Sequence, residues 1–263
     1  MIRVFVTLVC VWLSMSTLWA REYEPKVLIN VLERVEAEVE RGARPVVIFD
    51  LDETLIDTRP RSLSILREFG RSAQVRAVYR SASQILRESR LEDVVYHIED
   101  IARDLGLLDS ALVAQLKEYY SARYFSNEYL SRDRQIDGAK AYVMALQRAG
   151  ALIVYLTGRD KPRMGVGTEY SLVKLGFPLG GNAATLLMKS DKSIDDTSYK
   201  TEAFATIAKW GTVVGAFENE PRNVNAMATA FPEAITVFLD TMHSNKPDLP
   251  LPSLPWVKDF DLR

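Results

Sequence analysis

The chain has 263 residues, of which 48% are hydrophobic, so it is long enough to bury one large core or a core with a smaller insert. It carries 33 lysine and arginine residues against 35 aspartate and glutamate residues, a formal net charge of −2. This balance excludes a general attraction to nucleic acid polymers or to anionic membranes. An anionic ligand must therefore be bound by local groups.

The first twenty residues are typical of an export signal. Arg3 precedes an uncharged, mostly apolar run over residues 4–20, which is shorter than the about 20 apolar residues of a membrane-spanning helix. The run ends in Ala20, before the charged pair Arg21-Glu22, as in a secretory signal peptide. We expect cleavage after Ala20 and a secreted or periplasmic protein without stable membrane insertion. An uncleaved N-terminal anchor is the alternative.

The remainder of the chain alternates short apolar runs with helical patterns. Residues 46–49 are continuously apolar, rich in β-branched side chains and too few for a helix, which is typical of a strand buried on both faces. Similar runs lie at 151–156, 186–188, 212–217 and 234–239, and helical periodicity covers 26–41, 139–148, 168–175, 201–209 and 221–230. The alternation predicts an α/β fold with a doubly wound, Rossmann-like parallel sheet.

One stretch breaks the alternation. Residues 59–134 contain no convincing buried strand, and helical, polar-rich patterns cover 66–88, 91–105 and 110–120. We interpret this stretch as a helical cap inserted into the core. The predicted organisation is a signal peptide at 1–20, an α/β core at 21–58 and 135–263, and the cap at 59–134. The proline-rich tail from residue 246 is expected to be extended.

Two carboxylates follow the first predicted strand. Asp50 and Asp52 lie beyond its end, where ligands bind in a doubly wound sheet. Carboxylates this close to a buried strand are costly unless a partner such as a divalent cation compensates them. An ordinary surface turn is the alternative for an Asp-x-Asp pair, but the apolar run before it disfavours that interpretation.

The run Asp50-Leu51-Asp52-Glu53-Thr54-Leu55 after an apolar strand resembles the first motif of the haloacid dehalogenase-like hydrolase superfamily. Later segments resemble the other motifs in order: residues 154–159 with Thr157 for the second, Lys200 for the third, and 213–220 with Glu218 for the fourth. The match covers nearly all of the chain after Val46. Dehalogenases of this fold lack the second aspartate, so Asp52 favours phosphate esters.

The resemblance implies an acid-phosphatase-like, Mg²⁺-dependent enzyme that hydrolyses small phosphomonoesters. Asp50 would be the nucleophile that forms an aspartyl-phosphate, and Asp52 the general acid and base. Thr157 would bind a phosphoryl oxygen, and Lys200 would hold the nucleophile and neutralise phosphate charge. Substrate or phosphate contacts are expected from Leu51, Thr54, Gly158 and Arg159, with a solvated loop arginine as the alternative for Arg159. Magnesium ligands are expected from Asp50, Asp52 through its backbone carbonyl, and Glu218.

The fourth motif departs from the family pattern. It normally begins with Asp where Glu218 stands, and the usual later acid falls at Arg222 or Asn223. Asn219, Glu220 or Asn223 would have to replace it, for example by ordering metal-bound water. The same residues are also typical of a helix start. Lys189 and Lys192 are alternatives to Lys200.

The roles of several further residues stay open. His243 follows the last predicted strand and His97 lies in the insert; a structural role is favoured for each. Core packing is also favoured over ring stacking for the aromatic side chains of the insert, which are Tyr119, Tyr120, Tyr124, Phe125 and Tyr129. The expected partner is a small-molecule phosphate ester. The alternative function is a non-catalytic or phosphate-binding envelope protein on the same fold.

Overall fold

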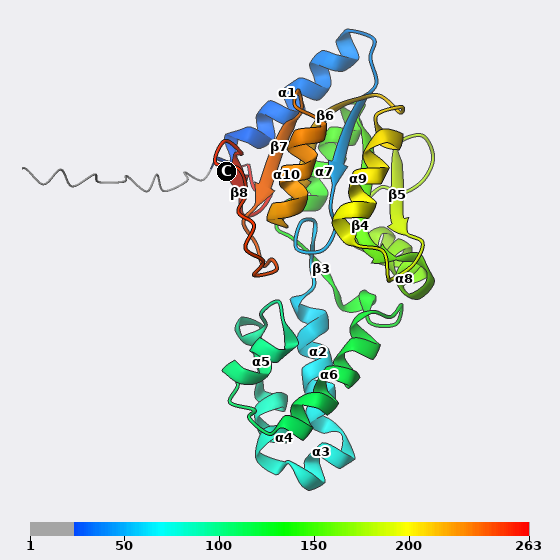
Figure 1. Cartoon of the computed structure of the whole chain (residues 1–263). Coiled ribbons are helices and arrows are strands. Elements are labelled where there is room, and N and C mark those ends of the chain that lie inside the picture. Colours follow the sequence, from blue (N-terminus) through cyan, green and yellow to red (C-terminus); the bar gives the residue numbers. More distant parts are fainter. Residues whose placement is uncertain (1–23, 263) are drawn as a thin grey trace, which may run out of the picture.

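The structure is a computed structural model that describes residues 24–262, so the expected signal peptide at residues 1–20 lies outside the described part. Its α/β body and its helical body lie one above the other, and two chain connections join them (Figure 1). Within residues 24–262, no helix combines the length and apolar character needed to cross a membrane.

An all-parallel sheet of six strands lies at the centre of the α/β body, in the order β5-β4-β1-β6-β7-β8. The strands are β1 (Pro45–Phe49), β4 (Leu152–Asp160), β5 (Ala184–Lys189), β6 (Thr212–Glu218), β7 (Ile235–Leu239) and β8 (Trp256–Val257). The chain runs from β1 outward to β5 and then crosses to β6 on the other side of β1. The strand order therefore reverses between β1 and β6, where ligands bind in such sheets.

Helices cover both faces of this sheet, as the doubly wound fold predicts. α1 (Lys26–Glu40), α7 (Ala139–Arg148) and α8 (Lys161–Leu175) pack on the face that carries Val47 and Phe49. α9 (Asp196–Ile207) and α10 (Pro221–Ala230) pack on the face that carries Val46 and Ile48. Because successive side chains of a strand point to opposite faces, the continuous apolar run of β1 supplies both cores at once.

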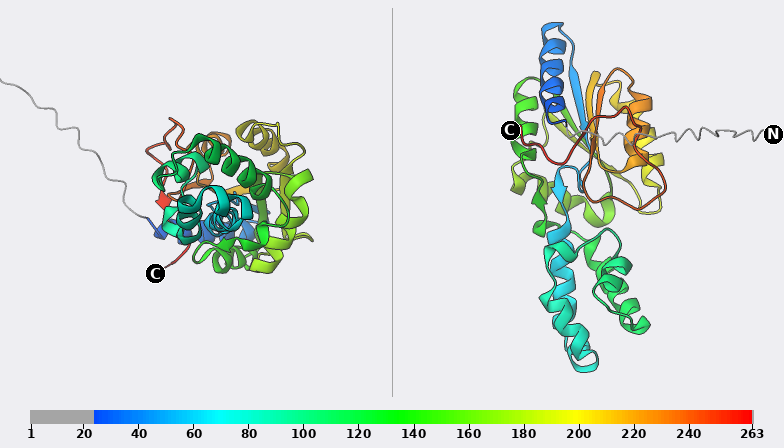
Figure 2. Two further views of the ribbon diagram at one scale, coloured as in Figure 1. Left: turned by 90° about the horizontal axis from the view of Figure 1, so that it is seen from below. Right: turned by 90° about the vertical axis from the view of Figure 1, so that its left-hand side faces the viewer.

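The helical body contains α2 (Arg59–Arg71), α3 (Ala73–Val78), α4 (Arg80–Glu88), α5 (Ile98–Asp104) and α6 (Ser110–Tyr124), with the short helices η1 (Leu91–Asp93) and η2 (Leu130–Arg132). It has an apolar core of its own, and the right-hand view in Figure 2 shows its helices projecting away from the α/β body. Its two connections to the α/β body pair as the antiparallel strands β2 (Ile56–Asp57) and β3 (Arg134–Gln135).

Several helix boundaries differ from the sequence prediction because of side-chain caps. The helical pattern over 66–88 is divided at Ser72, whose backbone leaves the helix with ψ 144° and whose side chain caps α3 at Val75. α9 begins at Asp196 rather than at 201, since Asp195 accepts a hydrogen bond from the Ser198 amide. Lys200 therefore lies inside α9 rather than before it.

Gly138 fixes the C-terminal tail against the core. It adopts φ 74° before α7, and a Cβ at this position would meet the backbone oxygen of Phe260 at 2.4 Å. The Phe260 amide donates to the Asp137 carbonyl at 2.9 Å, and the Phe260 ring packs near Phe49 and Phe217. The tail therefore closes the core instead of lying loosely over it.

Gly138→Ala should lower the free energy of unfolding by about 3 kcal/mol, because a left-handed backbone strain adds to a clash with the tail. The matched control is Gly180→Ala, at φ 86° with nothing within 4 Å of the added Cβ, which should cost about 1 kcal/mol from strain alone. Urea unfolding of both variants measures the difference. Equal destabilisation would show that the Phe260 contact contributes nothing.

Candidate active site

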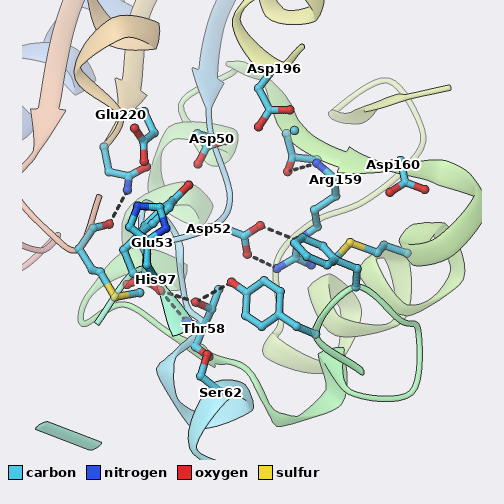
Figure 3. A pocket seen from close by; sticks show the side chains of 18 of the residues that line it. Asp50, Asp52, Glu53, Thr58, Ser62, His97, Arg159, Asp160, Asp196 and Glu220 are labelled. Carbon is cyan, nitrogen blue, oxygen red and sulfur yellow. Dashed lines mark hydrogen bonds and ion pairs between the residues drawn. The ribbon is translucent and has the colours of Figure 1, made fainter. Parts of the chain in front are cut away.

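A tight turn after β1 presents the two aspartates of the first motif. The Leu51 carbonyl accepts hydrogen bonds from the amides of Thr54, Leu55 and Ile56 at 2.9 to 3.2 Å. Glu53 adopts the left-handed region with φ 58°, which is uncommon for a residue with a side chain. The turn brings the carboxylates of Asp50 and Asp52 to one cavity of about 510 Å³ between the α/β body and the helical body (Figure 3).

The Glu53 side chain compensates for this backbone strain. Its carboxylate accepts hydrogen bonds from the Thr58 amide at 2.8 Å and the Thr58 hydroxyl at 2.6 Å, and thereby ties the turn to the start of α2. Burial raises the pKa of Glu53 to about 7, against the opposing effect of the two Thr58 hydrogen bonds. No role was predicted for Glu53 from the sequence.

Asp50 lies at the centre of a buried cluster of three charges. Its Oδ1 accepts a hydrogen bond from Lys200 Nζ at 2.5 Å, and the same ammonium lies 2.6 Å from Glu218 Oε2. The amides of Asn219 and Glu220 donate to the other oxygen of Glu218 at 3.1 and 3.0 Å. The ends of β1 and β6 therefore meet at Lys200, as the motif order predicts.

The charges of this cluster do not cancel. Two carboxylates face one ammonium, and all three side chains are buried, with Glu218 wholly inaccessible. Burial and the neighbouring Glu218 raise the pKa of Asp50 well above its ordinary value, although Lys200 opposes them. Burial would lower the pKa of Lys200, but the two carboxylates outweigh it and raise that pKa. A second cation at Asp50 would relieve the remaining negative charge.

The donor set of this cluster fits the magnesium ion that the family resemblance implies. Carboxylate oxygens suit this hard cation, and the second oxygen of Asp50 accepts no hydrogen bond from residues 24–262. No group of three or more His, Cys, Asp or Glu side chains in that part of the chain is arranged to hold a metal. The resemblance implies that the backbone carbonyl of Asp52 would complete the ligand set.

Asp52 belongs to a second, neutral cluster with Asp133 and two arginines. Arg159 donates to both carboxylate oxygens of Asp52 at 2.5 and 3.0 Å, and Arg61 reaches Asp52 at 3.3 Å. Asp133 accepts two hydrogen bonds from Arg61, both at 2.8 Å, and one from Arg159 at 3.1 Å. Burial would raise the pKa of Asp52, but Arg159 and Arg61 together lower it to about 2.

This cluster joins the helical body to the α/β body. Arg61 lies in the first turn of α2, Asp133 follows η2, and Arg159 is the penultimate residue of β4, so the cluster spans both connections. Arg61, Asp133 and Arg159 are nearly inaccessible, whereas the Asp52 side chain is 33% exposed. Arg159 is thus engaged by protein groups, which include the Thr168 hydroxyl at 3.2 Å. Its expected phosphate contact stays a prediction.

The remaining predicted residues divide into two groups. Thr157 and Gly158 line the cavity; the Thr157 hydroxyl accepts from the Arg159 amide, and a Cβ on Gly158 would meet the Asp196 carboxylate at 2.5 Å. Leu51 and Thr54 are wholly buried and do not line the cavity. Any contact of Leu51 or Thr54 with a phosphate would therefore involve backbone atoms.

The residues considered as alternatives to Lys200, or as replacements for the later acid of the fourth motif, form hydrogen bonds with other groups. Lys189 pairs with Asp196 and the Ile194 carbonyl rather than with Asp50. Asn219 donates to the Met242 carbonyl, Asn223 accepts from the Thr197 hydroxyl, and Glu220 accepts from the amide and hydroxyl of Ser244. Asn219, Glu220 and Asn223 all line the cavity, as does His97, whereas His243 does not.

The family model of the haloacid dehalogenase-like hydrolases matches residues 45–172, from the start of β1 through the helical body and into α8. The match contains Asp50, Asp52 and Thr157. The match to the haloacid dehalogenase-like hydrolase model over residues 45–172 confirms the resemblance seen in the motifs. No curated protein is similar enough to the chain to count as a match.

Solved structures resemble the chain in shape at low sequence identity. A predicted phosphoglycolate phosphatase from Haemophilus somnus is 13% identical, with a TM-score of 0.49 over 82% of this chain and 94% of that chain. Protein tyrosine kinase A of Mycobacterium tuberculosis is 18% identical, with a TM-score of 0.49 over 84% and 96%. A predicted phosphatase from Clostridium acetobutylicum is 15% identical, with a TM-score of 0.43 over 77% and 88%.

Asp133→Ala should lower the free energy of unfolding by about 3–5 kcal/mol, because it leaves two buried guanidinium groups with one carboxylate between them. Asp104→Ala, which removes an exposed partner of Arg103, is the control and should cost less than about 1 kcal/mol. Urea unfolding followed by circular dichroism measures both. A loss at Asp133 no larger than at Asp104 would contradict the description of a tightly coupled cluster.

Proposed function

We propose that the chain is an exported, magnesium-dependent phosphatase that hydrolyses small phosphomonoesters through an aspartyl-phosphate on Asp50. The observation that carries this proposal is the state of Asp50 at the cavity. One of its oxygens is held by Lys200, and the other accepts no hydrogen bond from residues 24–262. An oriented carboxylate with a free oxygen facing a ligand cavity is suited to nucleophilic attack.

In the first half-reaction, the free oxygen of Asp50 forms a bond to phosphorus as the bond from phosphorus to the ester oxygen breaks. The departing alcohol oxygen must gain a proton, and Asp52, which lines the same cavity two residues along the turn, would donate it from its protonated form; this requires that substrate binding loosen the pairing of Asp52 with Arg159 and Arg61, which lowers its pKa. Lys200 keeps Asp50 oriented during the attack. The Thr157 hydroxyl lies at the end of β4, where it can donate to a phosphoryl oxygen.

In the second half-reaction, water attacks phosphorus, the bond from phosphorus to Asp50 breaks and inorganic phosphate leaves. The attacking water loses a proton, for which the Asp52 carboxylate is the acceptor in the cavity. The Lys200 ammonium stabilises the carboxylate that re-forms at Asp50. The turnover thus restores Asp50 and consumes one ester and one water.

Asp50, Glu218 and the backbone carbonyl of Asp52 would hold the magnesium ion, which when bound supplies positive charge against the phosphate. The uncompensated negative charge of the buried cluster supports this assignment. The helical body at residues 59–134 would act as the cap that excludes water from the phosphoryl group. Its apolar core and its two connections support that role.

Export is proposed from the first twenty residues alone, which lie outside the described part of the structure. Their single basic residue, apolar run and final Ala20 support a signal peptide. A secreted or periplasmic location would give the enzyme access to phosphate esters outside the cytoplasm.

Asp50→Asn should lower kcat for p-nitrophenyl phosphate by at least about 10³-fold, because an amide of nearly the same shape cannot form the covalent intermediate. Asp57→Asn is the control, since Asp57 pairs with Arg59 at one connection and does not line the cavity around Asp50. Steady-state kinetics measure both. A parent chain that binds phosphate but hydrolyses no ester would instead favour a non-catalytic binding protein.

Chelation with EDTA should abolish hydrolysis, and excess Mg²⁺ should restore it. Glu218→Gln should raise the Mg²⁺ concentration for half-maximal rate by about tenfold or more, because it removes one charged ligand from the proposed site. The measurement is the initial rate over a series of Mg²⁺ concentrations. Full activity of the parent chain in EDTA would rule out the metal requirement.

A further inference from the structure

The cavity around Asp50 has two chemically different walls. The α/β body provides the charged floor described above. The helical body provides aromatic side chains, which are Tyr96, Tyr120, Tyr124 and Phe125 together with His97. The leaving group of a substrate whose phosphate lies at Asp50 would extend toward this second wall. The nature of that wall therefore bears on the class of leaving group.

The aromatic residues of the helical body serve two separate purposes. Tyr119 and Tyr129 donate hydrogen bonds to Glu68 and do not line the cavity. Tyr124 lines the cavity; it stacks on Tyr120 at 5.1 Å between ring centroids and contacts Phe125 edge-on at 5.0 Å. The packing role expected for the whole group therefore describes only some of its members.

Two large rings of the cavity wall stay accessible. Tyr96 is 42% and Phe125 38% exposed, and both line the cavity; the Arg163 guanidinium lies 4.9 Å from the centroid of the Phe125 ring. Tyr96 also contacts the His97 ring edge-on at 4.8 Å between centroids. An accessible ring in a concave site gains free energy when a flat apolar group covers it.

The charges of the cavity wall disfavour a second anionic group on the substrate. Eight aspartate and glutamate residues line the cavity against six lysine and arginine residues. Lys117 pairs with Glu99, Arg163 with Asp160, and Lys189 with Asp196. Apart from Lys192 at the exposed rim, every lysine or arginine of the cavity has an acidic partner within the described residues.

We propose that the cavity takes a phosphomonoester with one phosphate group and an uncharged leaving group that carries a flat aromatic ring, as a nucleoside monophosphate does. The phosphate would lie at Asp50 and Lys200, and the ring against Tyr96 and Phe125. This inference rests on the proposed phosphatase activity. It also disfavours bisphosphates and phosphorylated carboxylic acids as substrates.

The experiment compares kcat/KM of the purified full chain for adenosine 5′-monophosphate and ribose 5-phosphate. The two esters share the phosphate and the primary alcohol, and differ in the base. We expect a kcat/KM about 10–100-fold higher for adenosine 5′-monophosphate, from stacking on one or two rings. Phosphoglycolate, which carries an extra carboxylate, should be poorer than ribose 5-phosphate.

Phe125→Leu and Tyr96→Leu should each lower kcat/KM for adenosine 5′-monophosphate by about 5–20-fold and leave the value for ribose 5-phosphate within twofold. Tyr170→Leu is the matched control, because Tyr170 is 59% exposed on α8 and does not line the cavity. Thermal unfolding checks that each variant is folded. If a variant is not folded, the affinities of Asp50→Asn for adenosine 5′-monophosphate and for ribose 5-phosphate are compared instead. This comparison leaves both rings unchanged.

The outcomes separate the two proposals. Hydrolysis of neither ester, nor of p-nitrophenyl phosphate, would overturn the phosphatase and the inference with it. Equal kcat/KM for both esters by an active chain would overturn the inference alone. The inference would also fail if the leucine variants lost activity equally on both esters, since the rings would then support only the shape of the helical body.

Discussion

The site depends on the burial of Asp50 beside one ammonium and a second carboxylate. Burial of a charged group is costly unless opposite charge lies close by, so Lys200 must reach both Asp50 and Glu218. This requirement fixes the positions of three elements: the end of β1, the end of β6 and the second turn of α9. The same requirement leaves one negative charge for a ligand or metal to compensate. The sheet topology allows Lys200 to reach both carboxylates, because the strand order reverses between β1 and β6.

A second cluster of charged side chains connects the site around Asp50 to the helical body. Arg61 and Asp133 come from the two connections, and they surround Arg159, which in turn holds Asp52. A change in the position of the helical body would therefore alter the surroundings of Asp52 directly. The helical body also provides the aromatic wall of the cavity. Substrate choice and the placement of Asp52 thus depend on the same helices.

Much of this arrangement follows from the sequence. Five of the six strands of the parallel sheet were predicted from apolar runs, because strands buried on both faces carry continuous β-branched and aromatic residues. The approach of Asp50, Lys200 and Glu218 was implied by the resemblance to the family's motifs and their order. The short strand β8 was missed, because a two-residue strand in a proline-rich tail has no periodicity.

Residues that act through long-range pairing were not predictable. Arg61 and Asp133 are 72 residues apart, and neither differs in sequence context from a surface charge. The start of α9 was placed late, because the cap by Asp195 is a local hydrogen bond that apolar periodicity does not report. Tyr96 and Phe125 were indistinguishable from Tyr119 and Tyr129 in sequence. Only the fold separates the rings that line the cavity from those that bind Glu68.

The most direct test of the central claim is chemical trapping of the phosphorylated enzyme. Chain quenched in acid during turnover of a phosphate ester would be reduced with borohydride, which converts an acyl phosphate to an alcohol, and its peptides analysed by mass spectrometry. The account predicts homoserine at position 50 in the quenched sample and its absence without substrate. Trapping at another residue, or no trapping at position 50 in a chain that turns over and accumulates a phosphorylated form, would contradict it.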